Sequence, residues 1–314
     1  MGNKRKNYSN KKTKKLFKFI FLLVFLIFIL DNEFNFTQKY FINKNTNENI
    51  VDDLSNESQE EFENEFSVHF IDVGQGDATL FLYDEFTMLI DTGDTFAEND
   101  LMTYLEKMNV QNIDIFIGTH PHSDHIGNVK AVYDKYEVVK TIIPNAVHTT
   151  KTFEEMIAAI ENEKTEVVEA KAGYSETIGD LSIEILSPLR DSYTDLNDYS
   201  VVTKIKYKDI SLLFTGDATT LVEQDILDSG ANLNVDILKV PHHGSDSSSK
   251  KLFISSTLAD YGVISVGVDN DYGHPKESVL ETLDENNIEI LRTDKSGTII
   301  FSTDGIKYSI KNDR

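Results

Sequence analysis

The sequence predicts an α/β domain that begins at about residue 65 and runs to the C-terminus. Short runs rich in valine, isoleucine, leucine and phenylalanine alternate along this region with amphipathic stretches of helical period. About 245 residues can bury one substantial hydrophobic core, and neither an internal repeat nor a second globular domain is indicated.

The expected strands are short, and several end at glycine-containing loops that carry polar residues. The predicted strands cover residues 68–73, 79–83, 87–91, 113–118, 181–187, 201–207, 210–214, 236–240, 263–266, 288–291 and 298–302. The predicted helices cover residues 99–108, 153–162 and 275–286.

The first 30 residues predict an export signal or a membrane anchor. Residues 1–18 contain eight lysine or arginine residues and no acid, and residues 19–30 are continuously apolar. Twelve residues span about 18 Å as a helix, short of a ~30 Å hydrocarbon core, which is typical of a signal peptide. Signal cleavage needs small residues, however, and the first alanine is Ala78. An uncleaved anchor with its N-terminus in the cytoplasm is therefore favoured over a cleaved signal.

Residues 31–64 are rich in Asn, Glu, Asp and Ser and have no sustained period, which predicts a flexible acidic tether. The domain at residues 65–314 is then expected outside the membrane, either anchored or secreted. The chain has no cysteine, which excludes disulfides and thiolate metal ligands within it.

Residues 120–125 place three of the chain's eight histidines and one aspartate within six positions. Residues two apart in an extended segment point the same way, so His120 and His122 can offer two imidazoles to one cation. Asp124 and His125 then face a second cation. Imidazole and carboxylate ligands suit zinc, with manganese or iron as alternatives. The competing interpretation is a surface turn, which the partners further along the chain make less favourable.

Those partners follow two predicted strands. Asp217 follows the apolar run 210–214, and a carboxylate there can bridge two metals. His242 and His243 follow residues 236–240, and one of the pair can complete the second metal's ligands. Upstream, Asp72, Asp77, Asp91 and Asp94 lie at strand-to-glycine junctions. These aspartates are candidates either for holding the other ring nitrogen of a ligating histidine or for simple turn formation.

These motifs resemble the metallo-β-lactamase superfamily, and within it the extracellular hydrolase domain of the ComEC/Rec2 competence proteins. The resemblance covers about residues 66–311. It rests on Asp-Val-Gly-Gln-Gly-Asp at 72–77, the histidine cluster at 120–125, Thr-Gly-Asp at 215–217, Pro-His-His-Gly-Ser at 241–245 and Tyr-Gly-His-Pro at 272–275. Choline-phosphate esterases that act on teichoic acid are similar in the same places. The resemblance implies a four-layer αββα sandwich with a metal site along one edge of its two sheets.

The resemblance also implies roles for individual residues. The implied metal ligands are His120, His122, Asp124, His125, Asp217 as the bridging carboxylate and His242 as the late histidine. His243 and His274 become candidates for a ligand or for contact with a substrate phosphate, and Asp72, Asp77 and Asp91 for supporting the ligands. Many members carry one more histidine before the bridging aspartate. Only His148 could fill that role here, and it lacks the expected surrounding motif.

Two cations that share Asp217 lower the pKa of a bound water from 15.7 towards ~7, so a hydroxide can act as the nucleophile at neutral pH. No serine or cysteine nucleophile is needed, and Ser245 is expected to cap the following helix. His274 precedes Pro275, which is expected to open the helix at 275–286, so its ring would meet an anion at the helix N-terminus. His69, inside a predicted strand, is expected to be structural.

Charge limits the substrates. The formal net charge is −23, and it is −31 for residues 19–314 once the eight N-terminal cations are set apart. Such a surface repels a long polyanion unless a local patch attracts it. The candidates for that patch are Lys239, Lys250, Lys251, Lys276 and Lys295.

The favoured function is a cell-surface, metal-dependent phosphodiesterase or nuclease-like enzyme with two divalent ions, acting on DNA or a wall polymer. The alternatives are a phosphorylcholine esterase of a wall polymer, a lactone or β-lactam hydrolase, and a non-catalytic surface module. No protein partner is indicated, and one short apolar segment cannot form a DNA channel.

Overall fold

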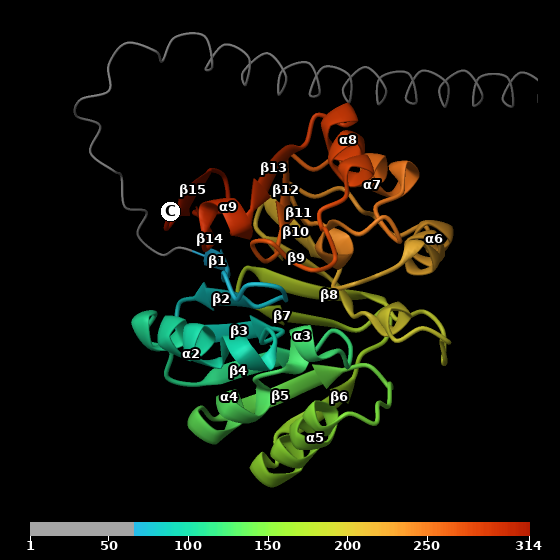
Figure 1. Ribbon diagram of the computed structural model, residues 1–314. Coiled ribbons are helices and arrows are strands. Elements are labelled where there is room, and N and C mark those ends of the chain that lie inside the picture. The colour runs from blue at the N-terminus through green and yellow to red at the C-terminus, as the bar shows by residue number, and fades with distance from the viewer. Residues whose placement is uncertain (1–65) are drawn as a thin grey trace, which may run out of the picture. The chain divides into compact units, whose positions relative to one another are not determined.

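Two mixed β-sheets form the centre of residues 66–314, the part of the chain that the computed structural model describes (Figure 1). The first sheet has the spatial order β15 (Tyr308–Asn312), β14 (Ile299–Thr303), β1 (Phe66–Phe70), β2 (Thr79–Tyr83), β3 (Phe86–Ile90), β4 (Ile113–Ile117), β5 (Val138–Ile143) and β6 (Glu166–Glu169). The second has the order β13 (Glu289–Arg292), β12 (Tyr261–Ile264), β11 (Ile237–Lys239), β10 (Ile210–Phe214), β9 (Val202–Tyr207), β8 (Leu181–Ser187) and β7 (Ser175–Ile178).

The sheets pack face to face through alternate residues of their strands. In β1, Phe66, Val68 and Phe70 all point into the space between the sheets, as the two-residue period of a strand requires. Phe214 of β10 meets them from the other sheet, and its ring lies 5.6 Å from that of Phe70 and 5.0 Å from that of Phe81. This aromatic cluster holds the two sheets together directly behind the loops that carry the polar motifs.

Helices cover the outer face of each sheet. The helices are α2 (Glu98–Lys107), α3 (Ser123–Ile126), α4 (Val129–Lys135), α5 (Lys151–Glu163), α6 (Thr220–Ser229), α7 (Lys251–Thr257), α8 (Glu277–Glu285) and α9 (Thr293–Ser296), with 3-10 turns η1 (Thr95–Ala97), η2 (Asn197–Tyr199) and η3 (Pro241–Gly244). Apolar residues of α2, α4 and α5 share one buried cluster with the outer face of the first sheet, and those of α6, α7 and α8 share another with the second sheet (Figure 1). The layers are therefore α, β, β and α.

The strand directions place the polar loops at one edge. β3 and β4 are parallel in the first sheet, and β10 and β11 are parallel in the second. The loops that follow these four strands contain Asp91, His120, Asp217 and His242, respectively. The carboxyl ends of parallel strands are where open α/β sheets form their binding crevices.

The α/β class and the two-sheet arrangement are confirmed. The strands predicted at 79–83, 181–187 and 210–214 have the expected bounds, and most others shift by one or two residues. The first strand ends at Phe70, three residues early, because the chain turns there into the glycine loop. The sequence pattern predicted no bounds for β5, β6, β7, β15, α3, α4, α6, α7 and α9. In β6 and β7 most side chains are exposed or only partly buried, so their residues show little apolar alternation.

The segments predicted as signal or anchor (1–30) and tether (31–64) lie outside the described residues. Within residues 66–314 no helix has the length and apolar character needed to cross a bilayer.

Candidate metal centre

The carboxylate of Asp217 lies at the centre of the site, just after β10. Its residue is only 2% exposed, and its backbone N–H donates to Ser200 Oγ at 3.0 Å. Gly216 before it has φ 49°, and a Cβ there would stand 3.0 Å from the Cβ of Thr119. Glycine therefore lets the β10 loop approach the histidine loop closely enough for Asp217 to reach it.

One oxygen of Asp217 belongs to a group of four acidic and imidazole side chains. Its Oδ1 lies 3.2 Å from Nε2 of His125 and 3.5 Å from Nε2 of His243. Asp124 Oδ2 is 3.4 Å from the same nitrogen of His243. The ligand atoms of these four residues all lie within 4.8 Å of one another. Such a set of two imidazoles and two carboxylates suits a divalent cation.

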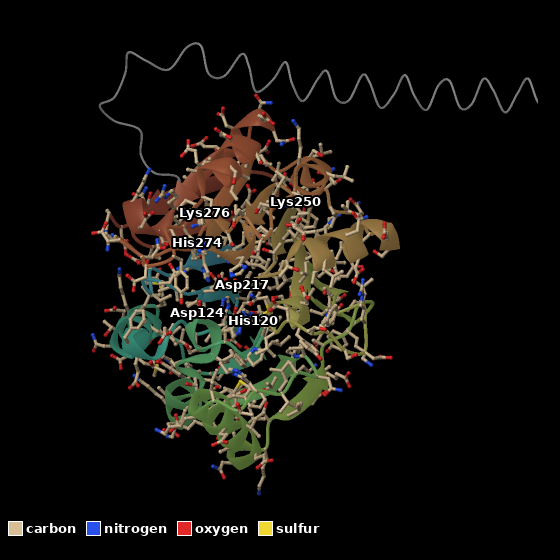
Figure 2. The ribbon with its side chains drawn as sticks, turned by 45° about the vertical axis from the view of Figure 1, so that its right-hand side comes forward. His120, Asp124, Asp217, Lys250, His274 and Lys276 are labelled. Carbon is tan, nitrogen blue, oxygen red and sulfur yellow. The ribbon has the colours of Figure 1, made fainter. Side chains whose placement is uncertain are left out.

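The other oxygen of Asp217 faces a different set of histidines. Oδ2 lies 3.4 Å from Nε2 of His242 and 3.9 Å from Nε2 of His120. Nε2 of His120 is in turn 3.0 Å from Nδ1 of His122. The two oxygens of one carboxylate thus divide the six candidate ligands around them into two groups, which is the arrangement expected of a bridging ligand. Figure 2 shows Asp217 close to His120 and Asp124.

The turn η3 divides the adjacent histidines between these two groups. His242 and His243 have φ values of 51° and 52°, and Gly244 follows at 81°. Left-handed conformations are unfavourable for a non-glycine residue and persist only where the surroundings impose them. His242 N–H donates to the carbonyl of Gly216 at 3.0 Å, which ties this turn to the Asp217 loop. The family resemblance predicted that His242 would be the last histidine ligand along the chain. It is His243 that joins Asp124 and His125, because the turn aims its ring inward and leaves His242 on the other side of Asp217.

Asp91 fixes the far side of the His125 ring. Its Oδ2 lies 2.7 Å from Nδ1 of His125 and accepts a hydrogen bond of 2.7 Å from Thr119 Oγ1, while Oδ1 accepts one of 2.8 Å from Thr119 N–H. An N–H at Nδ1 leaves the lone pair of Nε2 free for a cation. The supporting role expected of Asp91 matches this geometry.

Asp77 is the second carboxylate behind the ligands. Its Oδ1 lies 3.4 Å from Nδ1 of His243, and its Oδ2 lies 3.8 Å from Nδ1 of His125. Gly76 makes this approach feasible, because a Cβ at that position would stand 2.5 Å from the carbonyl oxygen of Asp124. The same carbonyl accepts the N–H of Asp77 at 3.0 Å. The Gly-Gln-Gly-Asp motif therefore lets the backbone of its loop pack closely against helix α3, which carries the ligands Asp124 and His125.

Lys239 is a functional candidate that the sequence suggested for a different reason. It was expected in a surface patch for a polyanion, yet it is 2% exposed and its Nζ pairs with Asp77. Lys251 pairs with Glu285 at 2.7 Å. Figure 2 shows Lys276 near His274 and Lys250 farther away, and Nζ of Lys276 donates to the carbonyl oxygen of Tyr272 at 2.7 Å. The continuous basic patch is therefore not formed, because one of its members points into the core and another is paired.

The electrostatics of the metal-free cluster favour a bound cation. Burial alone would raise the pKa of Asp217, but His125 and His243 outweigh it and hold the pKa well below its ordinary value. Burial would lower the pKa of His125 and of His243, but the carboxylates, with Asp217 foremost, raise both. The surrounding carboxylates therefore favour the protonated form of both imidazoles, and a bound cation would compete with those protons. Metal binding replaces those protons, so affinity is expected to fall as the pH falls.

Unpaired buried atoms converge at the same place. His125 Nε2, His243 Nε2 and Asp217 Oδ1 are buried and have no hydrogen-bond partner within residues 66–314. Buried polar atoms are rarely left unpaired, and three of them aimed at one point indicate a missing ligand. The residues present thus fit a divalent cation.

His274 lines the cavity in front of the cluster. Its ring centroid is 5.9 Å from that of His242, and it stacks on Tyr272 at 5.7 Å. The expectation that Pro275 opens the helix is wrong, because α8 begins at Glu277 and Pro275 packs against Gly244 instead. His274 is therefore held by the loop rather than by a helix terminus: its N–H donates to Asn270 Oδ1 at 2.9 Å.

The remaining candidates lie outside the cluster. His148 lines the cavity with its ring 6.1 Å from that of His122, but its Nδ1 contacts Thr150 Oγ1 at 3.1 Å. Asp72 pairs with Arg314 at 2.8 Å and accepts the N–H of Gly74, so its carboxylate is directed away from the candidate histidine ligands.

Three further residues have structural contacts instead. Asp94 accepts the hydroxyl of Ser123 at 3.0 Å, as a turn former would. Ser245 accepts the N–H of Ser247 rather than capping α7, which begins at Lys251. His69 contacts Tyr104 OH at 2.8 Å on the outer side of β1, which agrees with its expected structural role.

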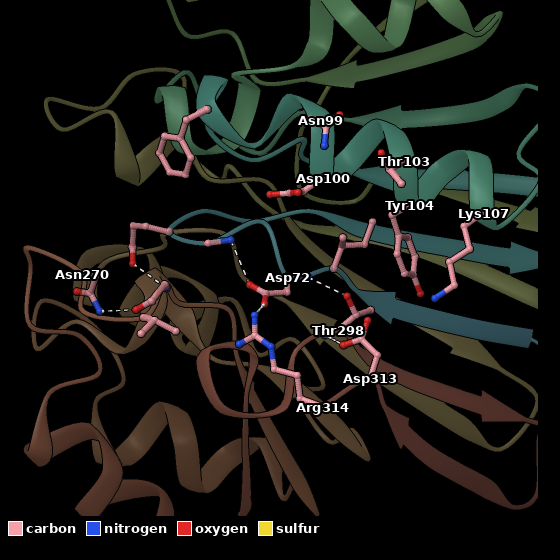
Figure 3. Close-up of a pocket in the computed structure, with 16 residues that line it drawn as sticks. Asp72, Asn99, Asp100, Thr103, Tyr104, Lys107, Asn270, Thr298, Asp313 and Arg314 are labelled. Atoms are coloured by element: carbon pink, nitrogen blue, oxygen red, sulfur yellow. Dashed lines mark hydrogen bonds and ion pairs between the residues drawn. The ribbon is translucent and has the colours of Figure 1, made fainter.

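Two hollows adjoin each other at Gln75. The cluster opens into a cavity of about 320 Å³, whose wall includes His122, Asp124, His242 and His274. Gln75 also lines a second hollow, a groove of about 710 Å³. Its walls come from α2, from the loop at Asn270 and from the end of the chain (Figure 3). Asp72, Asp100 and Asp313 line it together with Lys107 and Arg314, so carboxylates outnumber cations there.

Comparison with known proteins agrees with this geometry. Residues 71–268 match the model of the metallo-beta-lactamase superfamily. The chain is 32% identical over 254 residues to ComE operon protein 3 of Bacillus subtilis (strain 168), covering 75% of this chain and 33% of that protein. It is 31% identical over 241 residues to competence protein ComA of Neisseria gonorrhoeae, covering 76% and 32%. The chain thus spans about a third of these relatives.

Solved structures show the same fold at low identity. The metallo-beta-lactamase fold protein YhfI of Bacillus subtilis superposes with a TM-score of 0.53 at 14% identity, covering 77% of this chain and all of that one. The metallo hydrolase Igni18 of Ignicoccus hospitalis gives 0.50 at 15% identity, with 75% and 98% covered. With its two-sheet fold and its cluster of histidines and aspartates, the chain belongs to the metallo-β-lactamase superfamily and is related to the competence proteins.

Proposed function

We propose that this protein is a phosphodiesterase that works with two divalent metal ions, zinc being the expected ion and manganese the alternative. The observation that supports this most is the division of the Asp217 carboxylate between two groups of histidines. Bound divalent ions would supply Lewis-acid chemistry and a nucleophile derived from water at neutral pH. The two groups would be His120, His122 and His242 on one side and Asp124, His125 and His243 on the other.

The protein's own residues prepare the site for that chemistry. Asp91 holds Nδ1 of His125, and the carbonyl oxygen of Ser265 holds Nδ1 of His243 at 2.8 Å, so the Nε2 atoms of both rings face the cluster. The orientation of the His125 ring does not depend on a bound cation, because its partner Asp91 is itself held by two hydrogen bonds from Thr119. Asp217 is anchored by Ser200, and η3 is anchored to Gly216.

His274 is the candidate for direct contact with the substrate. Burial first, and then the neighbouring His243 and His242, lower the pKa of His274 to about 4. Its ring is therefore neutral at pH 7, and it can donate a ring N–H to a phosphate oxygen rather than release a proton. Its Nδ1 is buried and has no hydrogen-bond partner within residues 66–314, so no protein group fixes which ring nitrogen carries the proton.

A phosphoester substrate, either DNA or a wall polymer, fits the cavity better than a lactone or a β-lactam. Several imidazoles and few apolar side chains surround the cluster, and the adjoining groove allows a molecule longer than one phosphodiester. The groove's excess of carboxylates disfavours a second phosphate close to Asp100 and Asp313. A wall polymer with widely spaced charges is therefore a strong second candidate beside DNA.

The first prediction concerns the reaction. The purified metal-loaded protein should hydrolyse bis(p-nitrophenyl) phosphate, and the Asp217→Ala variant should not. DNA and p-nitrophenyl phosphorylcholine, tested in parallel, would separate a nuclease from a phosphorylcholine esterase. Activity on a lactone or β-lactam, with none on any phosphoester, would contradict the proposal.

The second prediction concerns metal content. The wild-type protein should bind about two divalent ions per chain, the number typical of bridged sites, as measured by elemental analysis. Asp217→Ala should lose most of both, because this carboxylate contacts both groups. His148→Ala is the matched control, since its ring lies in the cavity wall outside the cluster, and it should retain both ions. Equal metal content in Asp217→Ala and wild type would rule out the bridging role.

The third prediction concerns His274. His274→Ala should retain its metal and its circular dichroism spectrum but lower kcat/KM by roughly 10²-fold, the size of effect seen when a group acting on the transition state is lost. Loss of metal in this variant would make His274 a ligand instead. Unchanged kcat/KM would leave it a structural residue of the loop.

The fourth prediction concerns location. We propose that residues 19–30 anchor the chain and that the hydrolase domain lies outside the cell membrane, since the basic residues precede the apolar run. Protease added to intact cells should then remove the domain. Protection in intact cells, followed by digestion after lysis, would place the domain in the cytoplasm.

A further inference from the structure

Lys239 is a cation buried behind the candidate metal centre. It is the last residue of β11, in the middle of the second sheet, and its side chain is only 3% exposed. Its Nζ pairs with Asp77 Oδ2 and has no hydrogen bond that satisfies normal geometry within residues 66–314. An ammonium group is costly to bury, so a position that retains one calls for a specific reason.

The partner of Lys239 is a carboxylate that lies close to two candidate ligands. It makes no hydrogen bond to either ring, because Nδ1 of His243 contacts the carbonyl oxygen of Ser265 at 2.8 Å and Nδ1 of His125 contacts Asp91 at 2.7 Å. Asp77 comes from the first sheet's loop and lies 3.4 Å from Nδ1 of His243 and 3.8 Å from Nδ1 of His125. The pair therefore links the two sheets directly beneath the cluster. Asp77 Oδ1 has no hydrogen-bond partner within residues 66–314, and the charge of this carboxylate is paired through its other oxygen, Oδ2, with the ammonium of Lys239.

A second cluster shows what Asp77 could do without Lys239. One oxygen or nitrogen from each of Asp77, Asp91 and His125 lies within 4.8 Å of the others, on the Nδ1 side of the His125 ring. These atoms are buried and could themselves attract a cation. The ammonium of Lys239 already supplies a positive charge at this point, which leaves the Nε2 side as the place for metal.

We infer that Lys239 is a positioning residue: it holds Asp77 behind His125 and His243 and keeps that carboxylate out of the ligand set. This inference rests on the proposed metal-dependent function. Lys239 acts through Asp77 and does not touch the ligands themselves. Its effect on metal binding should therefore disappear when Asp77 is changed.

The sign of the effect distinguishes positioning from simple charge. Removing a positive charge near a cation site should tighten metal binding if the charge acts only through Coulomb repulsion. Loss of positioning should weaken it, typically by 10- to 100-fold for a group that supports ligands from behind. The two roles thus predict opposite changes in the dissociation constant.

The test is a double-mutant cycle on the full chain, with the dissociation constant for Zn²⁺ measured by titration of the metal-free protein. Lys239→Met should weaken binding at least about tenfold. Asp77→Asn should weaken it similarly, and Lys239→Met/Asp77→Asn should be no weaker than either single variant. The double variant removes both buried charges, so it also tests the inference if Lys239→Met alone fails to fold. Lys251→Met, which removes an exposed paired lysine on α7, should leave the constant unchanged.

Several results would overturn the inference. Tighter binding by Lys239→Met would assign the lysine a purely electrostatic effect. If the fold-increase of the Zn²⁺ dissociation constant in the double variant equals the product of the two single-variant increases, Lys239 does not act through Asp77. Failure of the wild-type protein to bind Zn²⁺ would instead overturn the proposed metal centre, and wild-type binding with unchanged binding by Lys239→Met would overturn only the role of Lys239.

Discussion

The structure depends on bringing buried carboxylates and imidazoles from two sheets to the two oxygens of Asp217. Like charges in such a cluster repel one another, and buried polar atoms without partners lower the stability of the fold, unless other groups compensate for them. The carboxylates raise the pKa of His125 and His243, which favours positive charge on these rings, and the ammonium of Lys239 offsets further negative charge. Divalent cations would replace the protons on the rings. The fold therefore carries an electrostatic cost at this edge that a bound metal would offset.

The rest of the domain is arranged to hold that cluster still. Phenylalanines between the sheets, among them Phe70 and Phe214, fix the spacing of the strands whose ends carry the ligands. Glycines at 76 and 216 let neighbouring loops come within contact of the histidine segment. Left-handed backbone at His242 and His243 then aims two consecutive rings at different oxygens of one carboxylate. Strain of this kind is found where side-chain placement matters more than backbone preference.

Much of the fold and the set of site residues could be predicted from the sequence. The spacing of apolar residues predicted the α/β class, and the histidine and aspartate motifs identified the residues that meet around Asp217. The division between His242 and His243 could not be predicted, because it depends on the φ angles of a four-residue turn. The sequence pattern also wrongly predicted that Pro275 starts α8. The proline packs on Gly244 instead. Lys239 looked like a surface cation in the sequence, since burial of a lysine depends on a partner 162 positions away, Asp77.

The sharpest test of this account is anomalous X-ray diffraction from crystals of the protein loaded with zinc or manganese. The account predicts two anomalous peaks about 3.5–4 Å apart, one on each side of the Asp217 carboxylate, the spacing seen in bridged two-metal sites. One peak would be near Nε2 of His125 and His243, and the other near His120, His122 and His242. No peak at Asp217, or a peak only among Asp77, Asp91 and His125, would contradict it.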